Sequence, residues 1–204
     1  LIVQMYGENW FHFLAESLPR LSYMLDFLRA NPQTVILHND RILRGREAFF
    51  TQLLGLDPKQ KWNVLQSLNQ AKGRTIFAER LFVPTASRCG TPPPKGIAVY
   101  QQLFKKNIPV LCKDEIKAVV HPVKVEQKKK LIVFQRRLKP RRMLLNHDQI
   151  KAAIQQEFSD SCTVVEFFGN ETIQHAAALH HYADIVIGPH GAGLANIIWS
   201  QPTS

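Results

Sequence analysis

The sequence of 204 residues has no long apolar run. No window approaches the roughly 20 consecutive apolar residues that a membrane-spanning helix needs. The charged segment and short apolar core of a secretory leader are also missing at its start. The chain nevertheless begins Leu-Ile-Val rather than with Met. We therefore expect it to be a fragment of a longer protein, with any targeting segment or membrane anchor outside it.

Cysteine is scarce, and so are short acidic motifs. Cys89, Cys112 and Cys162 are odd in number and none belongs to a C-x-x-C pair, which excludes a zinc-finger pattern and gives no disulfide framework. A D-x-D motif, which could hold a metal on a nucleotide, is absent as well. The sequence therefore predicts no metal site, and the disulfide state of the three cysteines stays open.

Acidic residues are few compared with basic ones. There are 16 Asp and Glu against 26 Lys and Arg, a net charge of +10. Lys124 to Arg142 alone holds nine Lys or Arg residues and one acid, Glu126, a net charge of +8. Such a concentration points to a local anionic partner. Nucleic acid, an anionic membrane surface and the diphosphate of a small ligand are all open on this observation.

The sequence does contain alternating helix-like and strand-like segments. An apolar share of 45% and a charged share of 21% are typical of a globular protein. Residues 9–30 place apolar side chains at helical spacing, and Pro19 is expected to kink or divide that helix. The other elements expected in this part are strands at 34–38, 62–66 and 75–84, a helix at 42–56 and a loop feeding a helix at 89–107.

From residue 131 onward the alternation is strict. The expected order is strand 131–136, helix 146–158, strand 162–168, helix 171–182, strand 183–188 and a last helix. This order predicts an α/β fold, with a parallel sheet covered by helices. The segment 121–130 is polar, basic and weakly patterned, and we expect it to be a linker.

The stretch PHGAGL, residues 189–194, follows the last of these strands. Ligands of open α/β sheets bind beyond the carboxyl ends of the strands, where helix N–H groups favour an anion. Gly191 and Gly193 would let phosphate oxygens approach the backbone, and His190 could donate to the same anion. A packing turn that needs small residues explains the glycines equally well.

The stretch QRRLKPRR follows the first strand of the same sheet and falls at the same edge. The planar guanidinium fork suits a diphosphate, so its arginines are candidate phosphate ligands: Arg136, Arg137, Arg141 and Arg142. The alternative is a solvated basic loop. The shared edge favours a role in binding.

His12 and Glu16 are four residues apart on the first expected helix, so they share a face. Such a pair in a cleft is a natural general base with its orienting partner, although a surface or capping pair is the commoner arrangement. Glu8, Asn9 and Arg20 flank the pair and could line the same cleft. His175, His180 and His181 are not spaced as metal ligands.

Four stretches in order resemble the catalytic domain of glycosyltransferase family 61. They are GENWFHFLAESLPRL (7–21), KLIVFQRRLKPRRMLLNHDQI (130–150), VVEF with ETIQHAAALHHYADIVIG (164–188) and PHGAGLANIIW (189–199). With VILHND and the CGTPPP loop between them, the resemblance spans nearly the whole chain. It implies an inverting enzyme that transfers a sugar from a nucleotide-sugar donor, a UDP-sugar, to a hydroxyl of a glycan or glycoprotein.

The resemblance also implies site residues. The implied catalytic pair is Glu16 and His12. The implied donor-binding residues are Arg136, Arg142, Asn146, His190, Gly191, Ala192, Gly193, Leu194 and Asn196. One departure is Gln135, where relatives more often have serine or another small residue. The arginines, helix N–H groups and His190 can meet the charge on the leaving diphosphate, so a metal is not strictly required. A divalent ion, Mn²⁺ or Mg²⁺, stays open.

The implied architecture is GT-B-like, with two Rossmann-like halves. We expect an N-terminal acceptor half at 1–120, the basic linker at 121–130 and a donor half at 131–204 that is incomplete, since the strand that usually follows the glycine helix is missing. The implied location is the Golgi or endoplasmic reticulum lumen in a eukaryote and the cytoplasmic side in a bacterium.

Two other functions remain open from the sequence. A non-catalytic relative would bind a nucleotide sugar without transferring it. A basic nucleic-acid-binding module would explain the charge, but the basic stretch lacks the interleaved aromatic residues of single-strand binders. We therefore expect no nucleic-acid partner, and membrane contact only through segments outside this chain.

Overall fold

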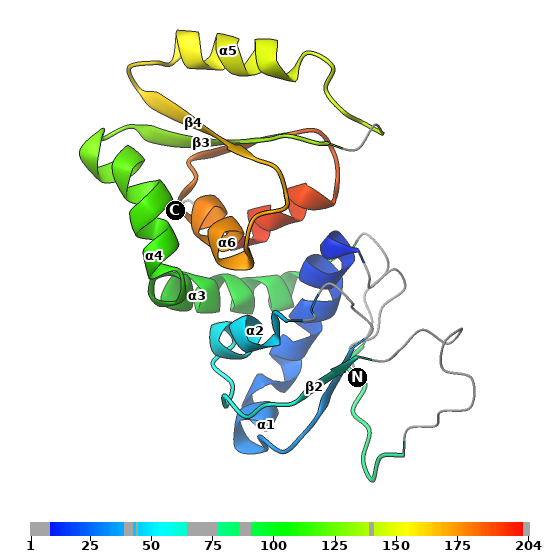
Figure 1. The fold of residues 1–204 in the computed structure, drawn as a ribbon. Helices are drawn as coiled ribbons and strands as arrows, with labels where there is room; N and C mark the ends of the chain where they lie inside the picture. The colour runs from blue at the N-terminus through cyan, green and yellow to red at the C-terminus, as the bar shows by residue number, and fades with distance from the viewer. Residues whose placement is uncertain are drawn as a thin grey trace. The chain divides into compact units, whose positions relative to one another are not determined.

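The computed structural model describes residues 9–38, 43, 45–64, 77–85, 91–138 and 141–201. The chain divides into two compact units, Leu1–Leu103 and Phe104–Ser204, and the division falls within helix α3 (Pro94–Leu111). Each unit contains parallel strands together with helices (Figure 1). The predicted α/β fold is therefore confirmed.

The first unit begins with a helical segment that buries one face. It consists of η1 (His12–Ser17), a wide π-type turn, then η2 (Leu18–Met24), a tighter 3₁₀ segment, and α1 (Leu25–Ala30). The helix changes type next to Pro19, whose ring removes a backbone donor. Its buried apolar residues recur every three or four positions: Leu14, Leu18, Leu21, Leu25 and Leu28.

The sheet of the first unit has two strands in the part that the structure describes. Strand β1 (Ile36–His38) pairs in parallel with β2 (Trp62–Val64), and α2 (Glu47–Leu53) lies between them in the chain. The helix is shorter than the expected 42–56. The chain leaves it through Gly55, whose φ of +61° is a left-handed conformation that glycine adopts without steric cost.

The strand expected at 75–84 is wrong over its described part. Residues 77–84 form no strand, and Phe77, Leu81 and Val83 are exposed. An apolar run favours a strand only where a neighbouring strand pairs with it and buries one face. The sheet gives this segment no such neighbour among the described residues.

The second unit contains a three-stranded parallel sheet. Strand β3 (Lys130–Gln135) lies between β4 (Cys162–Phe167) and β5 (Ile185–Ile187). Helix α5 (His147–Glu157) connects β3 to β4, and α6 (Ile173–Tyr182) connects β4 to β5. The 3₁₀ helix η6 (Ala192–Trp199) follows the glycine turn. This is the alternation that the sequence predicted.

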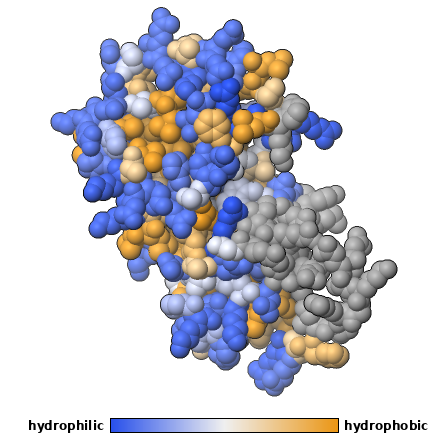
Figure 2. All heavy atoms as spheres, in the orientation of Figure 1, coloured by the Kyte–Doolittle hydropathy of each residue, from blue (hydrophilic) through white to orange (hydrophobic). Residues whose placement is uncertain are grey.

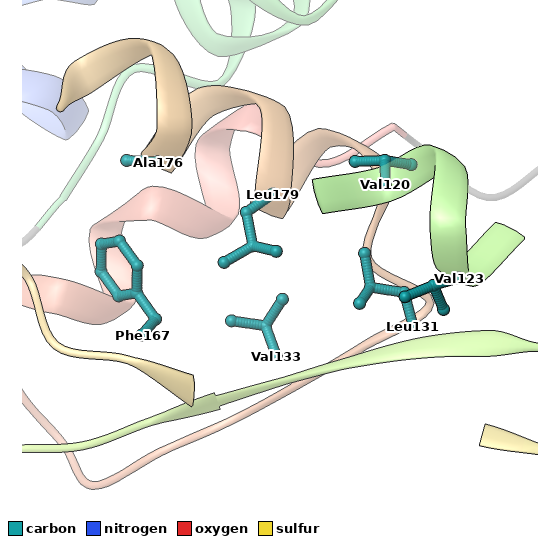
Figure 3. Packing of buried hydrophobic residues seen from close by; sticks show 7 residues of the cluster. All are labelled: Val120, Val123, Leu131, Val133, Phe167, Ala176 and Leu179. Atoms are coloured by element: carbon teal, nitrogen blue, oxygen red, sulfur yellow. The ribbon is translucent and has the colours of Figure 1, made fainter. Parts of the chain in front are cut away.

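The core of this unit lies between one face of the sheet and α6. Leu131, Val133 and Phe167 come from the strands, and Ala176 and Leu179 from α6 (Figure 3).

The segment before β3 closes the same core. It comprises α4 (Lys113–Glu115), η4 (Ile116–Val120) and η5 (Pro122–Glu126), and it buries Val120 and Val123. Residues 121–126, which were expected to be linker, are thus helical, because two apolar side chains at helical spacing reach the sheet. The observed units also have other bounds than the predicted halves, whose acceptor and donor roles stay predictions.

No helix in the described ranges is both long and apolar enough to cross a membrane. On the face drawn in Figure 2, hydrophilic side chains predominate among the described residues, with smaller apolar areas between them.

Candidate functional site

The residues that follow β3 and β5 meet at the carboxyl edge of the second unit's sheet. The two strands are parallel neighbours, so the chain leaves both at the same edge. Arg142, in the loop after β3, reaches His190, in the turn after β5: its Nη1 lies 2.5 Å from His190 Nδ1. The arginine loop and the glycine turn are therefore direct neighbours.

The Arg142–His190 contact fixes the position of the imidazole proton. A guanidinium can only donate, so Nδ1 must accept, and the neutral ring carries its proton on Nε2. Both side chains are exposed. Arg142 also has a φ of +63°, which costs a residue with a Cβ about 1 kcal/mol. The pair presents a cation and a ring N–H to solvent at the sheet edge.

The glycines of the turn make room for two side chains from the end of β3. A Cβ at Gly188 would lie 2.7 Å from Gln135 Cβ, and one at Gly193 would overlap the Gln135 amide. A Cβ at Gly191 would overlap Arg137 Nη1. Gly191 itself has extended backbone, with a φ of 168°. Packing around Gln135 and Arg137 thus accounts for the three glycines in this structure.

Arg136 points away from the turn, toward α5 and β4. Its guanidinium donates to both carboxylate oxygens of Asp148, at 2.7 and 3.0 Å, and to Glu166 Oε1 at 3.2 Å. The bond from Arg136 holds the pKa of Asp148 below its ordinary value. Two carboxylates therefore already match the charge of this predicted phosphate ligand.

Glu166 is the centre of that network. It also accepts from Lys151 and from His147 Nε2, the latter at 3.1 Å, and the hydrogen bond from Lys151 is the largest cause of its lowered pKa. The His147 ring stacks on Phe134 with centroids 4.2 Å apart. The network joins α5 to the sheet.

Three of the other predicted donor residues, Ala192, Leu194 and Asn196, belong to η6 beside the turn, and Asn146 does not. Asn196 is buried, and its amide donates to Gly193 O at 2.9 Å and accepts from Trp199 Nε1 at 3.0 Å. The Leu194 N–H donates to Gly191 O at 3.1 Å, and Ala192 begins η6. Asn146 is exposed and precedes α5 without a capping bond from its side chain. Asn196 thus fastens the turn, while Asn146 lies on the surface.

The predicted catalytic pair lies in the first unit. His12 Nδ1 is 2.9 Å from Glu16 Oε2 on successive turns of η1. Glu16 is fully buried, whereas the His12 side chain is 16% exposed. Because an ionised carboxylate only accepts, His12 Nδ1 donates and the ring lone pair is on Nε2. Of the two side chains, only that of His12 is partly exposed.

Of the residues that flank this pair, the structure describes Asn9 and Arg20. Asn9 Oδ1 accepts from the Phe11 N–H at 2.9 Å, as a helix cap does. Arg20 is buried and donates from Nη2 to Pro84 O at 2.5 Å, and burial lowers its pKa. Glu8 lies outside the described residues.

His180, His181 and the described cysteines do not take part in either of these sites. His180 Nδ1 bonds Ala176 O at 2.8 Å and His181 Nδ1 bonds Trp199 O at 2.7 Å. Cys112 is a buried free thiol, with a pKa raised by burial to about 12, and Cys162 is also free. Cys89 lies outside the described residues. Where the structure describes the chain, no three His, Cys, Asp or Glu side chains are grouped to hold a metal.

Two residues at the edge, Gln135 and Arg137, were not among the donor-binding residues that the resemblance implied. Gln135 appeared only as a departure from a family pattern, and Arg137 as one of four arginines. The expected strand 131–136 carried one signal: side chains alternate along a strand, so residues 135 and 136 point to opposite sides.

Comparison with known families adds the remaining observation. The sequence pattern of the family described as Glycosyltransferase 61 matches residues 10–204, a range that includes both the His12–Glu16 pair and the Arg142–His190 edge. No functionally curated protein matches the chain. A match over nearly the entire length shows the family, and it agrees with the resemblance carried by the four sequence stretches. The chain therefore belongs to glycosyltransferase family 61, whose members transfer a sugar from a donor to an acceptor.

Proposed function

We propose that this chain is the catalytic part of an inverting glycosyltransferase that uses a nucleotide sugar, with UDP as its nucleotide. The observation that carries the proposal is the Arg142–His190 pair at the carboxyl edge of a parallel sheet. Ligands of α/β sheets bind at that edge, and both side chains there donate hydrogen bonds that suit phosphate oxygens.

The donor diphosphate is proposed to lie against this pair. Arg142 donates from Nη1 to His190, so its Nη2 can donate to an anion. His190 can donate to the same anion from Nε2–H. These donors would stabilise the negative charge that grows on the leaving diphosphate. A divalent ion would add charge stabilisation there when bound. Since no described side chains form a set of ligands for one, no step is assigned to it.

The acceptor hydroxyl is proposed to lose its proton to His12. Inversion in a single displacement needs a base that removes this proton as the anomeric carbon is attacked. His12 Nε2 carries the lone pair, and the buried Glu16 carboxylate holds the ring through Nδ1 and stabilises the imidazolium that forms. We further propose that the two units form the acceptor and donor halves of a GT-B-like enzyme.

The acceptor is proposed to be a glycan or glycoprotein. The proposed location is the secretory pathway of a eukaryote or the cytoplasmic side of a bacterial membrane. The family resemblance supports both statements.

The experiment is a donor screen with the full-length protein. Release of nucleotide would be measured for a panel of UDP- and GDP-sugars, with and without Mn²⁺, in the presence of glycan acceptors. The expected result is release from a UDP-sugar that depends on the acceptor and is lost in His12→Ala. Binding of UDP-sugars without any release would instead identify a non-catalytic binding protein and overturn the proposal.

A further inference from the structure

The end of β3 sends neighbouring arginines to opposite sides of the sheet edge. Arg137 lies against the glycine turn, where its Nη1 occupies the space that a side chain at Gly191 would fill. Arg136 lies against α5 and β4, bonded to Asp148 and Glu166. Gln135, the last residue of β3, lies on the same side as Arg137, against Gly188 and Gly193.

The two arginines differ in how their charge is matched. Arg136 has two carboxylate partners, at 2.7 and 3.2 Å. Arg137 donates from Nε to the main-chain carbonyl of Arg141 at 2.5 Å, and no carboxylate in the described ranges pairs with it. The bond to Arg141 uses Nε, while the terminal nitrogen Nη1 lies beside Gly191 of the turn. The positive charge that the turn offers to an anion is therefore that of Arg137 together with Arg142.

A second, independent feature marks the turn as a place for a ligand. Gln135 is 94% buried, with 6% of its surface exposed, and its amide lies between Gly188 and Gly193. Its Oε1 has no hydrogen-bond partner among the described residues. Buried polar groups are normally paired. This acceptor is thus suited to a hydroxyl or N–H that the described part of the chain does not supply.

We infer that Arg137, rather than Arg136, is the arginine of this loop that contacts the donor diphosphate, beside the acceptor oxygen of Gln135. Arg136 instead ties the end of β3 to α5 and β4. The inference rests on the proposed nucleotide-sugar donor, of which it names a further binding residue. A diphosphate carries several anionic oxygens, so Arg142, beside His190, and Arg137, beside Gly191, can both bind it.

The test is titration calorimetry of the full-length protein with UDP and, separately, with inorganic pyrophosphate. Arg137→Met is expected to weaken the binding of both probes about tenfold, and Arg137→Lys to weaken it less, because lysine keeps the charge and loses the fork. Arg136→Met is expected to change affinity less than about threefold while lowering the melting temperature. Lys117→Met, an exposed site in η4, removes the same charge far along the chain and should leave binding unchanged.

The outcomes separate the inference from the function on which it rests. Binding that is unchanged in Arg137→Met, or weakened more by Arg136→Lys than by Arg137→Lys, would overturn the inference alone. Arg136→Lys keeps a cation beside Asp148 and Glu166. Its affinity for UDP and pyrophosphate can therefore be measured even where Arg136→Met does not fold. A wild-type protein that binds neither UDP nor pyrophosphate would overturn the proposed donor class, and the inference with it.

Discussion

Arg142 donates to His190 Nδ1 over 2.5 Å, across 48 residues of sequence, and this bond fixes which ring nitrogen of His190 carries the proton. The two residues come from separate loops that only the parallel pairing of β3 and β5 brings together. If the pair forms one donor-binding unit, its two members should not act independently.

Arg142→Ala and His190→Ala are each expected to weaken UDP binding about tenfold, because each removes a phosphate donor and also releases its partner. The double variant should be only slightly weaker than either single one, since contacting residues are not additive. Titration calorimetry checks both points. His121→Ala, an exposed histidine of the same unit, should bind UDP normally. Strictly additive losses would argue against a coupled pair.

Glu16→Gln and His12→Ala are expected to leave UDP binding intact and to lower turnover, by about 10² to 10⁴-fold, because the base is misoriented in one variant and missing in the other. Nucleotide release under saturating donor measures the effect. Since Glu16 is buried, a melting curve must accompany the assay. Asp26→Asn, an exposed acid in α1, is the matched control. Full turnover in Glu16→Gln would refute the assignment.

Gly193→Ala is expected to destabilise the protein by about 1–2 kcal/mol, because its Cβ would overlap the Gln135 amide in a packed region. Gln135→Ser removes that amide and should restore much of the loss. Gly188→Ala is the control: its Cβ meets Gln135 Cβ, which serine retains, so Gln135→Ser should not relieve it. Urea unfolding of the single and double variants measures this. Equal rescue of both alanines would contradict the packing geometry.

Acid is expected to destabilise the fold through His180. Burial lowers the pKa of His180 from 6.5 to about 4. The unfolded chain therefore binds the proton more readily, and stability falls as pH drops from 6.5 toward 4. Between pH 7 and pH 5 the expected loss is about 2 kcal/mol. Urea unfolding at both pH values should show a smaller loss in His180→Gln and an unchanged one in His121→Gln. If His180→Gln lost as much stability between pH 7 and pH 5 as the wild type, another group would cause the acid destabilisation.

The sequence by itself determined the elements and their order. Apolar spacing predicted the helical segment at 9–30, and the strict strand–helix alternation from residue 131 onward predicted the parallel sheet. These features depend on neighbours a few residues apart, so the pattern is visible along the chain. The same local rule failed at 77–84, where the apolar run pairs with no strand among the residues that the structure describes. The expected linker is helical at 121–126, where Val123 packs together with Val120 on a sheet that begins only at Lys130.

Only the tertiary structure decided which residues of the arginine loop contact the glycine turn and which contact α5 and β4. The sequence predicted that the arginine loop and the glycine turn share an edge, but four arginines in one loop look alike along the chain. In the fold, Asp148 and Glu166 bind Arg136, while Arg137 and Gln135 fill the space that three glycines leave. The physical reason is that a side chain's partners come from other elements. Hydrogen bonds, ion pairs and steric room are therefore fixed by packing and not by spacing.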